Sequence, residues 1–223
     1  MQRTQMQLFF QKFYQPFNIL LFLFICTFLY QYGDKWVTNY CAHLQLGAYV
    51  NILQWLTVFG ISLIYLLTLP VCAMYVRYIY IKPLLEKRIW FLWWCIFIPN
   101  GVCSILKVVF GRARPELWLS HNQYGFYFFK FQSNYSSFPS GHTITIFALI
   151  CGLSFLYPQY VILFIIPGIL IAISRILLLK HYLSDVITAV YLDVVILGFI
   201  MNYTARWHKR SMDEIIGCCK TCH

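Results

Sequence analysis

Residues 107–115 read KVVFGRARP, residues 139–142 read PSGH, and residues 174–185 read SRILLLKHYLSD. These three polar stretches interrupt long runs of uncharged, apolar residues, and this contrast decides the fold. An ionisable residue at the centre of a membrane helix costs about 2.5–3.5 kcal/mol on insertion scales. Charged residues that occur despite this cost indicate a functional site, to which all three stretches contribute.

The composition indicates an integral membrane protein. Of 223 residues, 61% are hydrophobic and only 11% are charged, which is not typical of a soluble domain. The formal net charge is +10, but the basic residues are spread over loops and motifs, so we expect no nucleic-acid partner. The length predicts one domain over 1–223, with a motif core at 107–185 and a cytoplasmic tail at 204–223.

Six apolar runs predict an all-α fold, a six-transmembrane helical bundle. The first run is interpreted as an uncleaved anchor, because no small-residue cleavage pattern follows it. Residues 33–45 are predicted to form a loop. The predicted spans cover residues 17–32, 47–76, 89–106, 143–157, 160–179 and 186–203.

The basic residues predict the orientation of this bundle. An even number of spans places both termini on one side, and the termini together with the 77–88 loop carry ten of the seventeen basic residues. Basic residues favour the cytoplasmic side. We therefore expect cytoplasmic termini and all three polar stretches at the outer, periplasmic face. The basic residues counted for the cytoplasmic side are Arg3, Lys12, Arg77, Lys82, Lys87, Arg88, Arg206, Lys209, Arg210 and Lys220.

The polar stretches contain what phosphate binding requires. Lys107, Arg114 and Arg175 supply positive charge for a phosphate dianion, and guanidinium groups match its oxygens. Lys107 and Arg114 are separated by about two helical turns, so we expect them on one helix face that ends at Pro115. Ser140 and Gly141 are typical of a helix N-terminus, whose free N–H groups bind anions.

Two histidines add reactive groups. His181 and Asp185 are four residues apart, so we expect the carboxylate to hold the imidazole with its other nitrogen free to attack. His142 is then the candidate proton donor for the leaving oxygen. Arg112 is interpreted as a headgroup contact. Asp193, within the sixth span, is interpreted as a hydrogen-bonded structural group or a partner of the site.

The three stretches together resemble the motifs of the type 2 phosphatidic acid phosphatase superfamily, which includes vanadium haloperoxidases and glucose-6-phosphatase. Lys107 and Arg114–Pro115, then residues 139–142, then Arg175, His181 and Asp185 match in order and spacing. The motifs span about a third of the chain, and the chain length and compact loops resemble the bacterial lipid phosphatase branch of this superfamily.

The resemblance implies a hydrolase of phosphate monoesters that uses no metal and no cofactor. His181 would form a phosphohistidine, Asp185 would orient it, and His142 would protonate the leaving group. The phosphoryl oxygens would be bound by Lys107, Arg114, Ser140, Gly141 and Arg175. The chain has only seven acidic residues, and no cluster of carboxylates for a two-metal site is visible among them.

The substrate is expected to be a phospholipid or glycolipid of the bacterial inner membrane, with a weak preference for a lipid A-type phosphate. Undecaprenyl-diphosphate and phosphatidylglycerophosphate phosphatases, a lipid phosphotransferase, and a catalytically silent membrane scaffold stay open as alternatives. Oligomeric state stays open too.

The aromatic stretch at 116–138 is interpreted as an interfacial belt or as a lid over the site. The cysteines of the tail, Cys218, Cys219 and Cys222, are interpreted as free thiols beside His223.

Overall fold

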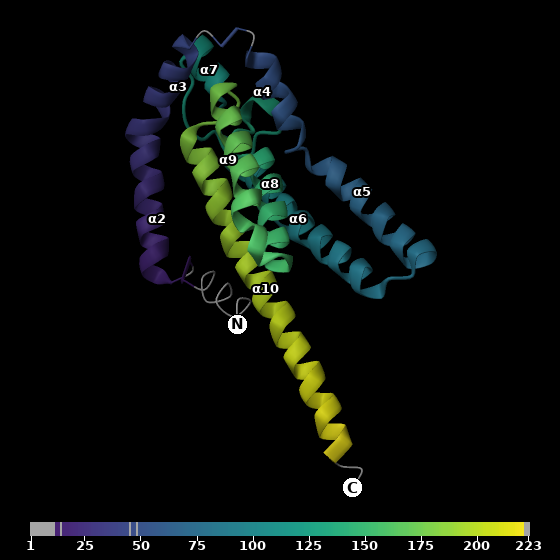
Figure 1. Cartoon of the computed structure of the whole chain (residues 1–223). Helices are drawn as coiled ribbons and strands as arrows, with labels where there is room; N and C mark the ends of the chain where they lie inside the picture. Colours follow the sequence, from purple (N-terminus) through teal and green to yellow (C-terminus); the bar gives the residue numbers. More distant parts are fainter. Residues whose placement is uncertain (1–11, 14, 45, 48, 221–223) are drawn as a thin grey trace.

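The computed structural model describes residues 12–220 except 14, 45 and 48, with side chains described up to Tyr203. The regular elements within these residues are helices, apart from an isolated antiparallel bridge between Arg112 and Phe126. The predicted all-α fold is therefore confirmed. Figure 1 shows a bundle whose long helices run roughly along one direction, with the start of α2 and the end of α10 at the same end.

The helices follow the order of the predicted spans. A continuous rod of α2, η1 and α3 comes first, followed by the broken pair α4 and α5 and by the long helix α6. The short helix α7 precedes α8, α9 and α10. Their bounds are α2 Pro16–Phe28, η1 Leu29–Gly33, α3 Asp34–His43, α4 Tyr49–Val58, α5 Ser62–Tyr75, η2 Val76–Tyr80, α6 Pro83–Phe110, α7 Pro115–His121, η3 Ser133–Tyr135, α8 Gly141–Leu156, η4 Pro158–Tyr160, α9 Val161–Leu177 and α10 Leu183–Lys220.

Five helical segments in the described residues are long and apolar enough to cross a bilayer. The remaining predicted span, the fourth at 143–157, corresponds to α8, which is apolar but has only 16 residues. Many large apolar side chains of α2, α5 and α9 are exposed on the outside of the bundle, as expected of surfaces that contact lipid. The five long segments are Pro16–His43, Tyr49–Tyr80, Pro83–Phe110, Pro158–Leu177 and Leu183–Tyr203.

Several predicted boundaries are wrong. The predicted loop at 33–45 is wrong for residues 33–43, because Gly33 has a helical φ of −80° and α3 follows it without a break up to His43. The second span is divided between Val58 and Ser62, where Gly60 lies in a turn. The third helix extends from Pro83, a residue suited to the first helical position, to Phe110.

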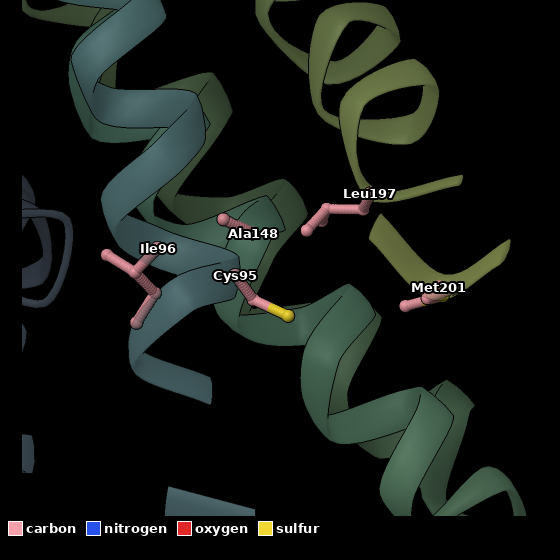
Figure 2. Close-up of a cluster of buried hydrophobic side chains, with 5 residues drawn as sticks. All are labelled: Cys95, Ile96, Ala148, Leu197 and Met201. Atoms are coloured by element: carbon pink, nitrogen blue, oxygen red, sulfur yellow. The ribbon is translucent and has the colours of Figure 1, made fainter. Parts of the chain in front are cut away.

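The core lies where α6, α8 and α10 meet. Figure 2 shows its fully buried members, Cys95, Ile96, Ala148, Leu197 and Met201. Small residues let the helices approach closely: a Cβ atom added to Gly168 of α9 would lie 2.2 Å from Cδ1 of Ile150 in α8. This packing holds the ends of α6, α8, α9 and α10 together, and the polar stretches occur at those ends.

Asp193 is a polar exception in this core. It is fully buried in α10, and neither carboxylate oxygen has a hydrogen-bond partner among the described residues. The interpretation of Asp193 as a hydrogen-bonded structural group is therefore wrong.

Candidate active site

The first polar stretch is not one continuous helix face. Helix α6 ends at Phe110, and Gly111 adopts the left-handed conformation with φ of 52°, while its N–H donates to the Lys107 carbonyl at 3.0 Å. Arg114 lies beyond α6 and precedes α7, of which Pro115 is the first residue. The prediction that Lys107 and Arg114 share a helix face ended by Pro115 is therefore wrong.

The turn nevertheless brings the two cations to one partner. Nζ of Lys107 donates to the Ser136 carbonyl oxygen at 3.2 Å, and Nη2 of Arg114 donates to the Ser136 hydroxyl at 3.1 Å. Ser136 precedes the second polar stretch, so this contact brings the first stretch against the second.

The second stretch forms the expected helix N-terminus. Ser140 is the N-cap residue of α8 and is fully buried, and Gly141 is the first helical residue. A Cβ atom at Gly141 would lie 3.6 Å from Nζ of Lys107, so this helix end adjoins the Lys107 ammonium group. Free N–H groups and the helix dipole favour an anion there.

The third stretch places His181 in the turn between α9 and α10. Its backbone N–H donates to the Arg175 carbonyl at 3.3 Å, and its side chain is 3% exposed. Nδ1 of His181 lies 2.7 Å from the Ser137 carbonyl oxygen. A carbonyl only accepts, so Nδ1 carries the proton and Nε2 keeps its lone pair. This is the tautomer that a nucleophilic histidine requires.

The hydrogen bonds of Asp185 differ from the predicted contact with His181. It lies in the first turn of α10, and Oδ2 accepts the N–H of Tyr182 at 2.9 Å, as an N3 residue does in a capping box. Oδ2 also accepts the Ser137 hydroxyl at 2.6 Å, and Oδ1 pairs with Arg112. Among the described residues, the hydrogen bonds of Asp185 include none to His181. Both residues contact Ser137, Asp185 through the hydroxyl and His181 through the carbonyl.

The electrostatics favour a neutral His181. Burial lowers the pKa of His181 well below its usual value, and the charges of Lys107, Arg175 and Arg114 lower that pKa further. The Ser137 carbonyl acts in the opposite direction. Three cations therefore act on one neutral imidazole, the arrangement needed to bind a phosphate beside a nucleophile.

His142 lies in the first turn of α8 and packs against Gly60. A Cβ atom at Gly60 would lie 2.8 Å from Cβ of His142 and 3.2 Å from its Cα. The turn between α4 and α5 thus leaves space for the histidine, a contact that the sequence did not reveal.

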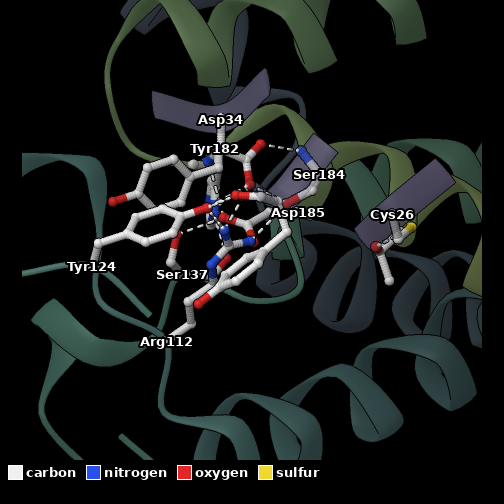
Figure 3. A network of polar contacts seen from close by, with 11 residues as sticks. Cys26, Asp34, Arg112, Tyr124, Ser137, Tyr182, Ser184 and Asp185 are labelled. Carbon is white, nitrogen blue, oxygen red and sulfur yellow. Dashed lines mark hydrogen bonds and ion pairs between the residues drawn. The ribbon is translucent and has the colours of Figure 1, made fainter. Parts of the chain in front are cut away.

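The interpretation of Arg112 as a headgroup contact is wrong. Its side chain is 1% exposed and forms ion pairs with Asp34 and Asp185. Burial alone would lower the pKa of Arg112, but the carboxylates of Asp185 and Asp34 outweigh burial and raise it. Figure 3 shows this network beside Ser137 and Ser184.

Sequence reasoning missed Asp34, Ser137 and Ser184. A useful signal was present for Asp34, because a lone carboxylate directly after an apolar run needs a partner.

In the part of the chain with described placement, no group of three or more His, Cys, Asp and Glu residues is arranged to hold a metal ion. Metal independence and the absence of a cofactor stay predictions, and Cys222 and His223 lie outside the described residues.

Comparison with known proteins identifies similar sequences. The chain is 33% identical over 97 residues to a lipid A 1-phosphatase of Rhizobium johnstonii, covering 44% of this chain and 40% of that protein. It is 35% identical over 86 residues to a lipid A 1-phosphatase of Rhizobium etli, covering 39% and 37% of the two chains. These alignments span less than half the length of either relative.

A solved structure shares the fold. The crystal structure of a transmembrane PAP2 type phosphatidylglycerolphosphate phosphatase from Bacillus subtilis superposes with a TM-score of 0.56, at 18% identity. The match covers 84% of this chain and 94% of that one. Together with the long apolar helices, these similarities identify an integral membrane protein. Residues 88–209, more than half of the chain, match the sequence model of the PAP2 superfamily, and the chain belongs to that family.

Proposed function

We propose that this protein is a metal-independent membrane phosphatase that removes phosphate from a lipid through a phosphohistidine at His181. One observation carries the proposal. Nδ1 of His181 donates to the Ser137 carbonyl at 2.7 Å, which leaves Nε2 free, while Lys107, Arg175 and Arg114 act on the same ring. Such a site combines a nucleophile with positive charge for a phosphate dianion.

The reaction has two steps. The phosphate oxygens bind Lys107, Arg114 and Arg175 together with the N-terminus of α8 at Ser140 and Gly141. Nε2 of His181 forms a bond to phosphorus while the bond from phosphorus to the lipid oxygen breaks, and His142 donates a proton to that oxygen. In the second step water, deprotonated by His142, attacks phosphorus, which releases inorganic phosphate and restores His181.

Asp185 has a supporting role in this proposal. It bonds the hydroxyl of Ser137, whose carbonyl holds Nδ1 of His181. The carboxylate therefore fixes the orientation of the nucleophile through one intervening residue.

The arrangement of the helices supports a site at one membrane face. We infer six crossings, with α8 as the short one: 16 residues extend about 24 Å, less than the ~30 Å hydrocarbon thickness. A helix this short leaves at least one of its ends inside the hydrocarbon layer, so Ser140 and His142 at its N-terminus would lie at or just below the level of the lipid headgroups. The distribution of basic residues supports cytoplasmic termini and a site on the outer face of a bacterial inner membrane.

Exposed aromatic side chains support a lipid substrate. In the loop between α7 and α8, Phe129 and Phe131 are 69% and 85% exposed. Rings at the level of the interface favour contact with acyl chains and headgroups, so this loop would guide a lipid to the site.

Similarity to the lipid A 1-phosphatases favours a lipid A-type phosphate as the substrate. The likeness to the phosphatidylglycerolphosphate phosphatase concerns the fold alone, and that substrate is the second candidate. A phosphotransferase would use the same phosphohistidine with a lipid acceptor in place of water.

The test is phosphate release by the purified protein from lipid A, phosphatidylglycerophosphate and undecaprenyl diphosphate, with a chelator present. The proposal expects release from at least one lipid and no release by His181→Ala. A silent scaffold would release none. A transferase would release phosphate slowly but would transfer the phosphoryl group to an added acceptor lipid.

A further inference from the structure

A buried ion cluster lies beside the site, and it includes a residue far from the three motifs. Arg112 is 1% exposed, and its two partners Asp34 and Asp185 are fully buried. Nη2 donates to Asp34 at 2.7 Å, and Nη1 pairs with Asp185. Asp34 opens α3, outside residues 88–209 that match the family, so the first helical rod of this chain contributes to the cluster.

Asp34 fixes the start of α10. Its Oδ1 accepts the backbone N–H of Ser184 at 2.9 Å, and its Oδ2 accepts the Ser184 hydroxyl at 2.6 Å. Ser184 is in the first turn of α10, where N–H groups lack helical acceptors. Asp34 therefore caps this helix from another segment of the chain, and Nη1 of Arg112 also donates to the Ser184 hydroxyl at 2.7 Å.

Arg112 is linked to the proposed nucleophile by two chains of hydrogen bonds, both of which pass through Ser137. The Arg112 carbonyl accepts the N–H of Ser137 at 3.1 Å. The Arg112 guanidinium holds Asp185, whose Oδ2 accepts the Ser137 hydroxyl at 2.6 Å. Both the backbone N–H and the hydroxyl of Ser137 are thus hydrogen-bonded, and the Ser137 carbonyl is the acceptor for Nδ1 of His181. Figure 3 shows Arg112, Asp34, Asp185 and Ser137 in this arrangement.

Aromatic rings enclose the guanidinium. The rings of Tyr182, Tyr30, Phe126 and Tyr124 lie 4.5–5.6 Å from Cζ of Arg112. Such rings stabilise the cation and exclude water, which strengthens each charge interaction inside. The cluster is therefore a rigid support for Ser137.

We propose that Arg112 and Asp34 are positioning residues for the nucleophile: they hold Asp185 and Ser137 so that the Ser137 carbonyl keeps His181 in the Nδ1–H form. This inference rests on the proposed function of His181. It assigns a role to the α2–α3 rod, whose docking on α10 is part of what keeps the nucleophile oriented.

A cavity next to Arg112 makes a specific test possible. About 320 Å³ of space is lined by Arg112 together with Cys26, Tyr30, Phe138 and Ser184. Truncation in Arg112→Ala would enlarge this space, and added free guanidinium tests whether the missing head group can be replaced there. A cation of another shape, such as ammonium, lacks the planar set of donors that bonds two carboxylates at once.

The kinetic experiment measures kcat and KM per folded molecule for the parent, Arg112→Ala, Arg112→Lys and Asp34→Asn. We expect kcat to fall about 100-fold in Arg112→Ala and Asp34→Asn, since small misplacements of a reacting group cost about this factor, while KM changes little. Millimolar guanidinium should raise kcat of Arg112→Ala but leave His181→Ala inactive. The matched control is Arg77→Ala, an exposed arginine paired with Glu86 outside the three motifs, which should behave as the parent.

A second readout needs no substrate. Nitrogen-15 NMR of histidine-labelled protein should show His181 in the Nδ1–H form in the parent and a mixture of tautomers in Asp34→Asn, which is nearly isosteric and keeps an acceptor for Ser184. Unchanged kcat and an unchanged tautomer in folded Asp34→Asn would overturn the positioning role, as would Arg112→Ala that folds but gains nothing from guanidinium. A parent that releases no phosphate from any lipid overturns the proposed function instead, and the tautomer still tests the positioning role.

Discussion

Nδ1 of His181 lies 2.7 Å from the carbonyl oxygen of Ser137, so a main-chain acceptor orients the imidazole. The Ser137 hydroxyl in turn donates to Asp185 at 2.6 Å. In the proposed mechanism, the order His181, Ser137, Asp185 means that the carboxylate would support the nucleophile through one intervening residue. Variants of Ser137 therefore separate orientation from phosphate binding.

Ser137→Ala should lower kcat about tenfold with little change in KM, because it removes one hydrogen bond that fixes the carbonyl and leaves the phosphate ligands intact. The matched control is Ser136→Ala, the neighbouring position, whose hydroxyl accepts from Arg114 at 3.1 Å. That variant should mainly raise KM, because Arg114 loses the contact that aims it at the phosphate. Steady-state kinetics on one lipid substrate checks both, and the same pattern in the two variants would contradict the separation.

The pH dependence of kcat/KM follows from the charges around His181. Burial and the charges of Lys107, Arg175 and Arg114 hold the pKa of His181 below its usual value, while Asp185 faces the same turn from α10. A nucleophile must be neutral, so activity rises with pH through this pKa, and the rising limb should lie below about pH 6.5 in the parent.

Lys107→Met should move this limb to higher pH, since it removes a charge that disfavours the imidazolium. The measurement is kcat/KM of the parent and of the variant as a function of pH, from acid to neutral pH, and the midpoint of the rising limb is compared. A limb that moves to lower pH, or stays in place, contradicts the assignment. A lowered pKa also means that the unfolded state binds more protons, so His181 contributes stability that is lost as pH falls below about 6.5.

Gly60→Ala should impair His142 specifically. The new methyl group would start 2.8 Å from Cβ of His142, so the histidine or the turn between α4 and α5 has to shift. A displaced proton donor should slow hydrolysis of a lipid alkyl phosphate about 100-fold. An activated aryl phosphate needs no acid and should be affected far less. Gly101→Ala is the control, because a Cβ atom there meets nothing within 4 Å.

Asp193→Val should stabilise the protein. Both carboxylate oxygens are fully buried and lack hydrogen-bond partners among the residues that the structure describes, and an unsatisfied buried polar group costs about 1–3 kcal/mol. We expect the melting temperature in detergent to rise by several degrees, since about 1 kcal/mol corresponds to about 2–4 °C at this chain length. Asp185→Val should lower it, because the oxygens of Asp185 are bonded. A lower melting temperature for Asp193→Val would contradict the expectation.

The sequence predicted the features that local physics decides. Apolar runs specified the helices, and Ser140 was recognised as the start of α8 because N-cap chemistry is local. The turn at Gly111 was missed, since Lys107 and Arg114 were treated as one helix, although a glycine after an apolar helix favours a left-handed end.

Contacts between distant segments could not be predicted. Asp34 and Arg112 are 78 positions apart, and their ion pair depends on how α3 docks against the loop after α6. The direct contact expected between His181 and Asp185 failed for a related reason. A spacing of four residues implies neighbours only within a helix, and α10 begins after His181.

The most direct test of the central claim is to trap the covalent intermediate on His181. In His142→Ala, an aryl phosphate carrying phosphorus-32 should phosphorylate the protein readily, because its leaving group needs no acid, whereas hydrolysis of the intermediate should be slow without the base. After an alkaline quench, we expect label on the peptide that contains His181, stable in alkali and lost in acid, and no label in the double variant with His181→Ala. Phosphate release without label on His181, or label that persists in the double variant, would contradict a phosphohistidine at His181.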